Sequence, residues 1–235
     1  MKEPISIIIP AYKTQAFIQE CLDSLESQTY FQDFNNYEIL LGIDGSEEML
    51  DTINSIRSRY HNLSVYLMRT NYGAYITINT LLDIAKYKWA LCFGSDDIAL
   101  PFMVETIMAQ KEEANMVQFG YYSFKNNVIF NENIDYKLRI APGTIFFDKD
   151  LILEYGGYRP WMCGADTELL KRLHMKIRGI TLMGCLFYRR IHPGSLCGRL
   201  PETNPERIRA IKYVSNMNPK ADPHIEKIIG EYTHV

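Results

Sequence analysis

The chain has 235 residues, enough for one large domain whose core needs neither a disulfide nor a bound metal. Hydrophobic residues make up 47% and charged residues 23% of it, which excludes wholesale disorder, a coiled coil and a disulfide-stapled miniprotein. The formal net charge of −3 provides no general attraction to nucleic acid, so no nucleic-acid partner is expected.

The first hundred residues alternate short β-branched runs with segments whose apolar residues recur at helical spacing. This alternation predicts an α/β fold with a mostly parallel central sheet flanked by helices. The strands are expected at 5–9, 38–43, 63–67 and 89–93, and the helices at 16–28, around 49–56 and around 76–85.

Polar segments follow each of these four predicted strands. In open parallel sheets, ligands bind beyond the carboxyl ends of the strands, so these segments should gather along one edge and carry the chemistry. They are Pro10-Ala11-Tyr12, Asp44-Gly45-Ser46, Asn71-Tyr72-Gly73 and Gly94-Ser95-Asp96-Asp97.

The character of the chain changes after about residue 115. Aromatic-rich runs separated by Asn- and Gly-containing turns predict a smaller mixed or antiparallel addition to the sheet, with strands at 116–124, 128–130, 144–147 and 180–190. A helix is expected at 167–175, a loop at 192–204, and a further helix with Asn204 as its cap and Pro205 at its first position. A terminal helix is expected at about 224–232.

These elements predict one domain over residues 1–204, with a nucleotide-binding half (1–98) and an acceptor-binding half (99–204), followed by a helical extension (205–235). The five cysteines are odd in number and form no C-x-x-C pair, which predicts reduced core thiols. The apolar run Ile5–Ile9 is too short for a signal sequence, and no 18-residue apolar window exists, so a cytoplasmic location is expected.

The segment 171–212 carries ten Lys and Arg residues against two carboxylates. A solvated face is one interpretation of such a run. A phosphate-bearing ligand, or peripheral contact with an anionic membrane, is the other.

Asp96 and Asp97 are adjacent carboxylates at the end of an apolar strand. They repel each other unless they are solvated or bridged by a cation. A solvated turn would satisfy them, and so would Mg²⁺ or Mn²⁺ held together with substrate phosphate oxygens.

Four further residues are ambiguous when taken singly. Asp44 can form an Asx-turn or accept a hydrogen bond from a nucleotide base, and Tyr12 can stack on that base or pack in the core. His192 is a lone histidine at a strand-to-loop boundary, and Asp166 can be an ordinary residue at a helix start.

In their order and spacing, these pieces resemble one family. Over roughly residues 3–200 the chain is similar to family 2 glycosyltransferases of the GT-A fold. The segments that carry the resemblance are Ser6–Tyr12, Glu38–Ser46, Asn71-Tyr72-Gly73 with Asn79, Ser95-Asp96-Asp97, Gly143–Phe147, Gly156–Arg159, Asp166–Arg172 and Tyr188–Leu196.

The resemblance implies transfer of a sugar from a nucleotide-diphospho donor, with UDP as the expected carrier, to a hydroxyl of a glycan, a lipid-linked or a protein acceptor. It implies Mn²⁺ or Mg²⁺ held by Asp97, with Asp96 and His192 as further ligands, and an inverting reaction with Asp166 as general base. Trp161 and Gly164 are expected at the acceptor. The residues expected at the donor are Pro10, Ala11, Tyr12, Asp44, Asn71, Gly73, Asn79, Ser95 and Asp96, with Arg190 and Arg199 at the diphosphate when the basic loop closes.

The chain departs from the family pattern at three positions. Gly94 stands where many members have an acidic residue, Ile78 where they have an Arg, and Ala165 where they have a Glu. A catalytically silent nucleotide-sugar-binding domain therefore remains an alternative. A nucleotidyltransferase and a dinucleotide-dependent oxidoreductase are disfavoured, because no Gly-rich phosphate loop follows the first strand and no G-x-G-x-x-G follows any predicted strand.

Overall fold

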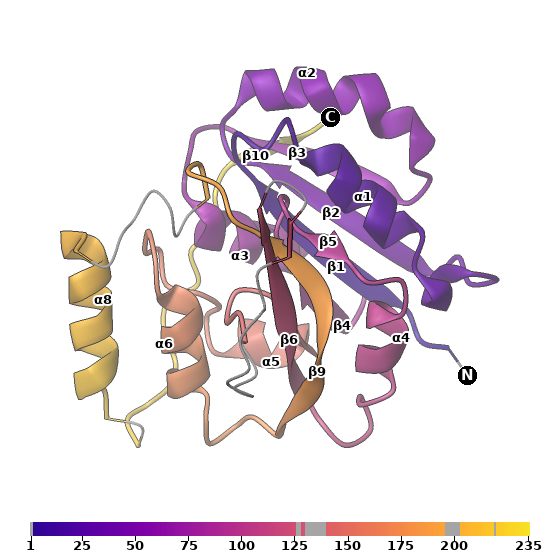
Figure 1. Ribbon diagram of the computed structural model, residues 1–235. Helices are drawn as coiled ribbons and strands as arrows, with labels where there is room; N and C mark the ends of the chain where they lie inside the picture. Colours follow the sequence, from indigo (N-terminus) through magenta and orange to yellow (C-terminus); the bar gives the residue numbers. More distant parts are fainter. Residues whose placement is uncertain (1, 126–127, 130–139, 196–202, 219) are drawn as a thin grey trace.

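The computed structural model describes residues 2–125, 128–129, 140–195, 203–218 and 220–235 (Figure 1). Its strands are β1 (Ile5–Ala11), β2 (Tyr37–Ile43), β3 (Leu63–Met68), β4 (Trp89–Cys92), β5 (Ile98–Ala99), β6 (Met116–Lys125), β7 (Val128–Ile129), β8 (Ile145–Asp148), β9 (Gly179–Arg190) and β10 (Tyr232–His234). They form a ten-stranded sheet in the order β10-β3-β2-β1-β4-β8-β6-β9-β5, with β7 paired to β6.

The first four strands form the parallel half of the sheet, as their sequence predicts. β1 lies between β2 and β4 and is parallel to both, and β2 is parallel to β3. All seven residues of β2 and all four of β4 are buried, which explains why these runs are continuously apolar rather than alternating.

Helices cover both faces of the sheet and divide the core into two clusters. The α-helices are α1 (Ile18–Glu26), α2 (Glu47–Ile56), α3 (Ala74–Ile84), α4 (Met103–Met108), α5 (Lys149–Glu154), α6 (Ala165–Arg172) and α8 (Pro205–Asn216), with short 3₁₀ turns at Thr29–Phe31 and Arg57–Arg59. Buried residues of α1, α2 and α4 pack in one cluster, and those of α3, α5 and α6 pack in the other. No helix in the described residues is long and apolar enough to cross a membrane.

The second half of the sheet is mixed, also as predicted. β8 is antiparallel to β4 and to β6, and the long β9 runs parallel to β6 with two register shifts. The short elements β5, α4 and α5 have two, six and six residues and were not predicted, because so few residues give no measurable periodicity.

The predicted helix at 224–232 is wrong: this segment is extended and ends in β10, which pairs antiparallel with β3. Its backbone groups find partners outside the segment. Gly230 N donates to Thr80 Oγ1 at 2.9 Å, and Asn79 Nδ2 donates to the Ile228 carbonyl at 3.1 Å. Tertiary hydrogen bonds therefore replace the bonds of a helix, and the segment 205–235 is helical only in α8.

The predicted start of α8, with Asn204 as the N-cap, is confirmed. Asn204 Oδ1 accepts hydrogen bonds from Glu206 N at 2.9 Å and Arg207 N at 3.4 Å, and Pro205 occupies the first turn. This cap satisfies amide groups that have no partner within the helix.

Gly156 packs closely against the C-terminal segment at Ile225. We therefore expect Gly156→Ala to lower the free energy of unfolding by at least about 1–3 kcal/mol. Its φ is +86°, and an added Cβ would lie 2.0 Å from the carbonyl oxygen of Ile225. Urea unfolding measures the loss. Gly184→Ala is the control, because nothing lies within 4 Å of a Cβ there. Equal stability of the two variants would contradict this tight packing.

Candidate active site

The polar segments that follow β1 to β4 lie together at one edge of the sheet, as the parallel topology predicts. Asp44 N donates to the Ala11 carbonyl at 2.9 Å, and the Asp44 carboxylate accepts a hydrogen bond from Tyr72 N at 2.7 Å. Thr14 Oγ1 donates to Ser95 Oγ at 3.0 Å. Each segment is therefore bonded to one of the others or to a loop beside it.

Asp44 organises the end of this edge where the sequence analysis expects the donor. Its carboxylate is 2% exposed and accepts the amides of Tyr72 and Gly73, the second at 2.9 Å. Gly73 directly precedes α3, so the carboxylate also lies at a helix N-terminus, where a negative charge is favoured. Beside it, a pocket of about 370 Å³ is lined by residues that include Gly45, Glu47 and Arg69.

Other residues expected at the donor are unequally placed. Tyr12 and Pro10 are half-buried at the end of β1, and Asn71 is exposed. Ala11 and Ser95 are 1% and 4% exposed, and their bonds hold the strand ends together.

Asn79 does not reach the surface, which corrects its expected contact with the donor. It is fully buried, and its amide exchanges hydrogen bonds of 2.8 Å with the backbone of Tyr158. Since its second amide hydrogen goes to Ile228, Asn79 ties α3 to two segments of the second half.

Asp96 and Asp97 lie side by side after β4. Asp97 is 6% exposed, and burial together with the neighbouring Asp96 charge raises its pKa well above the usual value. The amide of Arg190 donates to Asp97 Oδ1 at 2.9 Å and only partly offsets this. The pair is therefore electrostatically unfavourable by itself, and a bound cation would stabilise it.

The two carboxylates supply oxygen atoms of the kind that a hard divalent cation binds. A Cβ at Gly94 would lie 2.7 Å from Asp97 Oδ2 and 3.1 Å from Asp96 Oδ1, so both carboxylates pack against Gly94, and a side chain there would clash with them. No group of three His, Cys, Asp or Glu with metal-binding geometry occurs in the described residues. Two carboxylates completed by water and phosphate oxygens are the set that Mg²⁺ and Mn²⁺ accept.

His192 and Arg190 come from the end of β9 and support the carboxylate pair. His192 Nε2 lies 2.8 Å from Asp96 Oδ2, and its ring packs on Phe17. Arg190 Nε donates to the Asp96 carbonyl at 2.9 Å, and its guanidinium lies between the rings of Phe17 and Phe124. These contacts position the pair. Arg199 lies outside the described residues.

Asp166 occupies the first turn of α6, at the other side of the edge. Thr167 N donates to Asp166 Oδ1 at 2.7 Å, and the hydroxyl of Tyr75 also favours the ionised form. Burial outweighs both bonds and raises the pKa of Asp166 above its ordinary value. A half-buried carboxylate with a raised pKa is a stronger base than a solvated one.

The segment that leads into α6 lies beside the turn at Gly73. A Cβ at Gly73 would lie 3.8 Å from the sulfur of Met162, so this segment borders the turn held by Asp44. Trp161 is half-buried and meets the ring of Tyr213 edge-on at 5.2 Å. Gly164 caps α6 with a left-handed φ of +79° and packs against Ala210 of α8.

Sequence reasoning missed a buried ion network behind this site. Glu168 Oε1 accepts bonds from Arg159 Nε at 2.9 Å and Arg172 Nε at 2.8 Å. The i, i+4 spacing of Glu168 and Arg172 on α6 was the available signal. The three positions at which the chain departs from the family pattern lie in different surroundings. Gly94 borders the carboxylates, whereas Ile78 and Ala165 are buried in the core.

Comparison with known proteins shows the family of this chain. The family model described as glycosyl transferase family 2 matches residues 6–163. The glycosyltransferase GlyG of Streptococcus pneumoniae is 30% identical over 127 residues, which are 53% of this chain and 41% of GlyG. The chain thus spans less than half of that relative's length.

Two solved structures share the fold. Staphylococcus aureus TarS 1–349 in complex with UDP-GlcNAc superposes with a TM-score of 0.72 at 17% identity, over 92% of this chain and 68% of TarS 1–349. The mannosyltransferase PcManGT of Pyrobaculum calidifontis, in complex with GDP-Man and Mn²⁺, superposes with a TM-score of 0.65 at 15% identity, over 93% of this chain and 72% of PcManGT. The chain belongs to glycosyl transferase family 2 and has the GT-A fold.

Proposed function

We propose that this protein transfers a sugar from a nucleotide-diphospho-sugar, with UDP as the carrier, to an acceptor hydroxyl in a metal-dependent, inverting reaction. The observation that carries the proposal is the Asp96–Asp97 pair, in which a buried and a half-buried carboxylate lie side by side against Gly94, after one of the four parallel strands. TarS in complex with UDP-GlcNAc and PcManGT in complex with GDP-Man and Mn²⁺ support this assignment of donor and metal.

On the donor side, Asp44 fixes the turn at Tyr72 and Gly73, and Tyr12 at the end of β1 supplies an aromatic face for the base. Asp97 and Asp96 would hold the divalent ion, with His192 orienting Asp96. When bound, this ion neutralises charge on the departing nucleotide diphosphate, so no protein acid is needed there.

On the acceptor side, Asp166 takes the proton from the acceptor hydroxyl as that oxygen attacks the anomeric carbon. Attack from the face opposite the diphosphate inverts the configuration. Tyr75 and the Thr167 amide hold the carboxylate in place, and burial keeps it basic. Trp161, beside the same helix start, is proposed as part of the acceptor platform.

A thermal-shift series with UDP, UDP-sugars and GDP-mannose, each with Mn²⁺ or with EDTA, tests the donor side. Binding raises the melting temperature because ligand stabilises only the folded state. We expect the largest rise with UDP-sugars and Mn²⁺, and a donor affinity weakened by about 1–3 kcal/mol in Asp44→Ala, since two backbone amides lose their acceptor.

Glu48→Ala is the matched control, because Glu48 is exposed on α2 and lies outside the proposed site. Unchanged donor affinity in Asp44→Ala would remove Asp44 from the donor site. Binding of UDP-sugars without transfer or hydrolysis across acceptors would favour the silent nucleotide-sugar-binding domain.

A further inference from the structure

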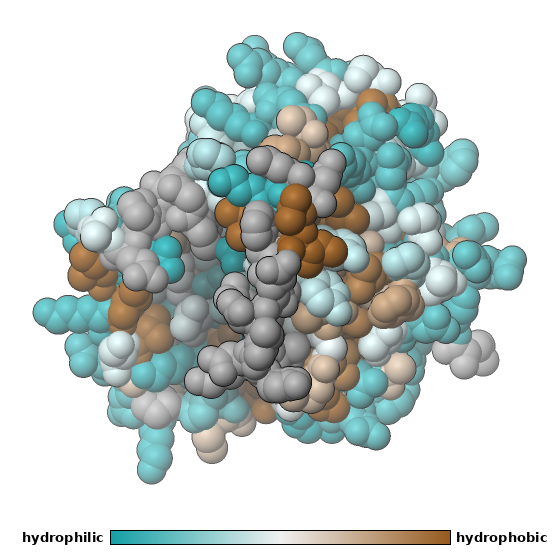
Figure 2. Space-filling model, viewed as in Figure 1, coloured by the Kyte–Doolittle hydropathy of each residue, from teal (hydrophilic) through white to brown (hydrophobic). Residues whose placement is uncertain are grey.

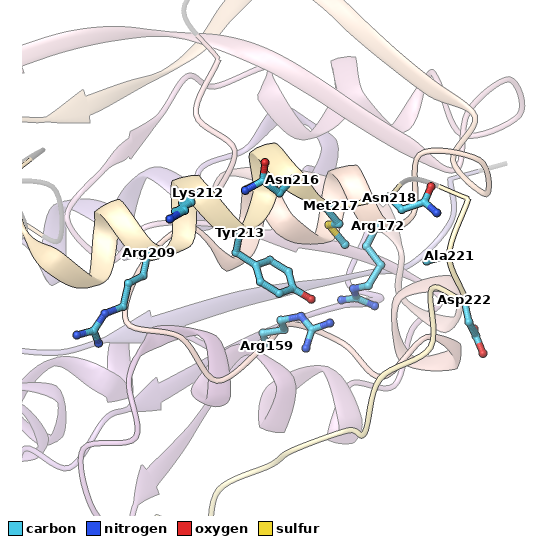
Figure 3. A pocket seen from close by; sticks show the side chains of 10 residues that line it. All are labelled: Arg159, Arg172, Arg209, Lys212, Tyr213, Asn216, Met217, Asn218, Ala221 and Asp222. Atoms are coloured by element: carbon cyan, nitrogen blue, oxygen red, sulfur yellow. The ribbon is translucent and has the colours of Figure 1, made fainter.

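A second pocket of about 560 Å³ lies between α6, α8 and the chain that follows α8 (Figure 3). None of the residues assigned above to donor or metal lines it. The lining residues are Arg159, Arg172, Arg209, Lys212, Tyr213, Asn216, Met217, Asn218, Ala221 and Asp222.

The lining is strongly cationic, with four Arg and Lys side chains against one carboxylate. That carboxylate, Asp222, already accepts both the amide and the ring nitrogen of His224, and these bonds lower its pKa. Arg172 is buried and bonded to Glu168 and to three backbone carbonyls. Its charge is therefore largely matched within the fold.

Arg209 and Lys212 differ from Arg172 in this respect. Within the described part of the chain, neither side chain has a hydrogen-bonding or ion-pair partner. They lie one turn apart on α8, with Tyr213 beside them, and Figure 3 shows the Tyr213 ring between this helix and Arg159. Arg159 gives only its Nε to Glu168, so its terminal nitrogens remain available to a ligand.

The pocket adjoins the proposed acceptor side. The helices α6 and α8 run parallel, because Ala210 packs on Gly164 at the start of α6 while Lys171 near its end donates to the carbonyls of Val214 and Ser215. Arg209 thus adjoins Ala210, and Ala210 contacts Gly164, two residues before Asp166. The Arg159 guanidinium lies 5.9 Å from the Trp161 ring centroid and 5.4 Å from that of Tyr213.

We infer that this pocket binds a phosphate group carried by the acceptor, so that the acceptor is a phosphate-bearing glycan or polyol. The inference rests on the proposed function, because it extends the acceptor side of that site. Guanidinium groups pair with phosphate oxygens in a bidentate manner. The exposed ring of Tyr213 and the amides of Asn216 and Asn218 suit the sugar or polyol that accompanies the phosphate.

A lipid surface is the competing partner for the same charge. Ile208 and Ile211 are 51% and 55% exposed on α8, and Figure 2 shows apolar side chains among hydrophilic ones over this helix. Neither residue lines the pocket, whereas Arg209, Lys212 and Tyr213 do. The cations of α8 therefore border the same pocket as Arg159, whereas the exposed isoleucines do not, and this favours a discrete phosphate over a flat membrane.

The binding test uses inorganic pyrophosphate and calorimetry on the full chain in EDTA, so that no metal supports binding at the Asp96–Asp97 pair. The variant is Arg209→Gln with Lys212→Gln, which removes two charges without burying any. We expect its affinity to fall about tenfold or more, as two charge-assisted hydrogen bonds are lost. The control, Arg57→Gln with Arg178→Gln, removes a half-buried and an exposed charge that do not line the pocket, and should stay within about twofold of wild type.

Equal pyrophosphate affinity in wild type and the pocket variant would overturn the inference. So would loss of binding to phosphatidylglycerol vesicles in that variant without loss of pyrophosphate binding, which would assign the charge to lipid.

A kinetic arm compares two synthetic acceptors that differ only in one phosphodiester. The pocket variant should raise KM for the phosphorylated acceptor about tenfold, while the donor KM and the kcat stay near wild type. If pyrophosphate binding depends on the pocket but no sugar is transferred from any donor, the proposed function is contradicted. Phosphate binding by the pocket would still be supported. An equal rise of KM for both acceptors would contradict the pocket's role.

Discussion

Replacing Asp166 with asparagine is expected to lower the rate of sugar transfer by about 10²–10⁴-fold, the usual cost of a lost general base. Asparagine keeps the size of the side chain and can still accept the hydrogen bond from Thr167 N, so α6 should start at the same place. Donor and metal binding should stay near wild type, because Asp166 is not among the residues assigned to the donor or the metal. Single-turnover transfer and thermal shift with UDP and Mn²⁺ measure the two effects separately.

The pH profile gives this variant a signature that a structural role would not produce. Burial raises the pKa of Asp166, so the carboxyl is protonated and inactive below that pKa and ionised above it. The wild-type kcat should therefore fall as the pH drops through a value above the ordinary 3.8 of aspartate, and Asp166→Asn should lack this limb.

Asp51→Asn, an exposed change on α2, is the control and should transfer at the wild-type rate. Near-normal transfer by Asp166→Asn would exclude the Asp166 carboxylate as the general base. A product that retains the anomeric configuration of the donor, read by NMR, would exclude the inverting mechanism itself.

Asp97→Asn is expected to weaken Mn²⁺-dependent donor binding by about 100-fold or more, because it removes a carboxylate ligand of the proposed metal. The amide oxygen can still accept the hydrogen bond from Arg190 N, so the turn after β4 should remain. The metal-free variant should be at least as stable as wild type in urea, since one of two repelling, desolvated charges is gone. A pair of donor titrations, with Mn²⁺ and with EDTA, measures the metal-dependent part.

Glu20→Gln is a useful control, because Glu20 pairs with Arg190 at the edge of the same site but is not proposed to touch the metal. Its metal-dependent donor binding should change by less than about tenfold, as for an exposed ion pair. Asp97→Asn with normal Mn²⁺-dependent binding would show that the cation is held elsewhere.

The sequence by itself determined the parallel half of the sheet and the edge at which the chemistry is proposed. The runs at Ile5–Ala11 and Tyr37–Ile43 are almost continuously apolar, which is typical of parallel strands that are covered on both faces. Because these strands are parallel, their carboxyl ends lie at the same edge of the sheet. The sequence therefore predicts Asp44 and Asp97 at that edge without knowledge of their contacts. The cap of α8 at Asn204 was equally local and equally readable.

Only the tertiary structure decided which polar residues of that edge are available. Asn79 follows the family pattern, but its amide is consumed by the backbone of Tyr158 and Ile228, segments about 79 and 149 residues away. The last strand, β10, depends on pairing with β3, and Arg209 and Lys212 line a pocket because Ala210 packs on Gly164. Local spacing encodes periodicity and caps, whereas hydrogen bonds and charge pairs between distant segments exist only after the chain has folded, and these decide burial and availability for chemistry.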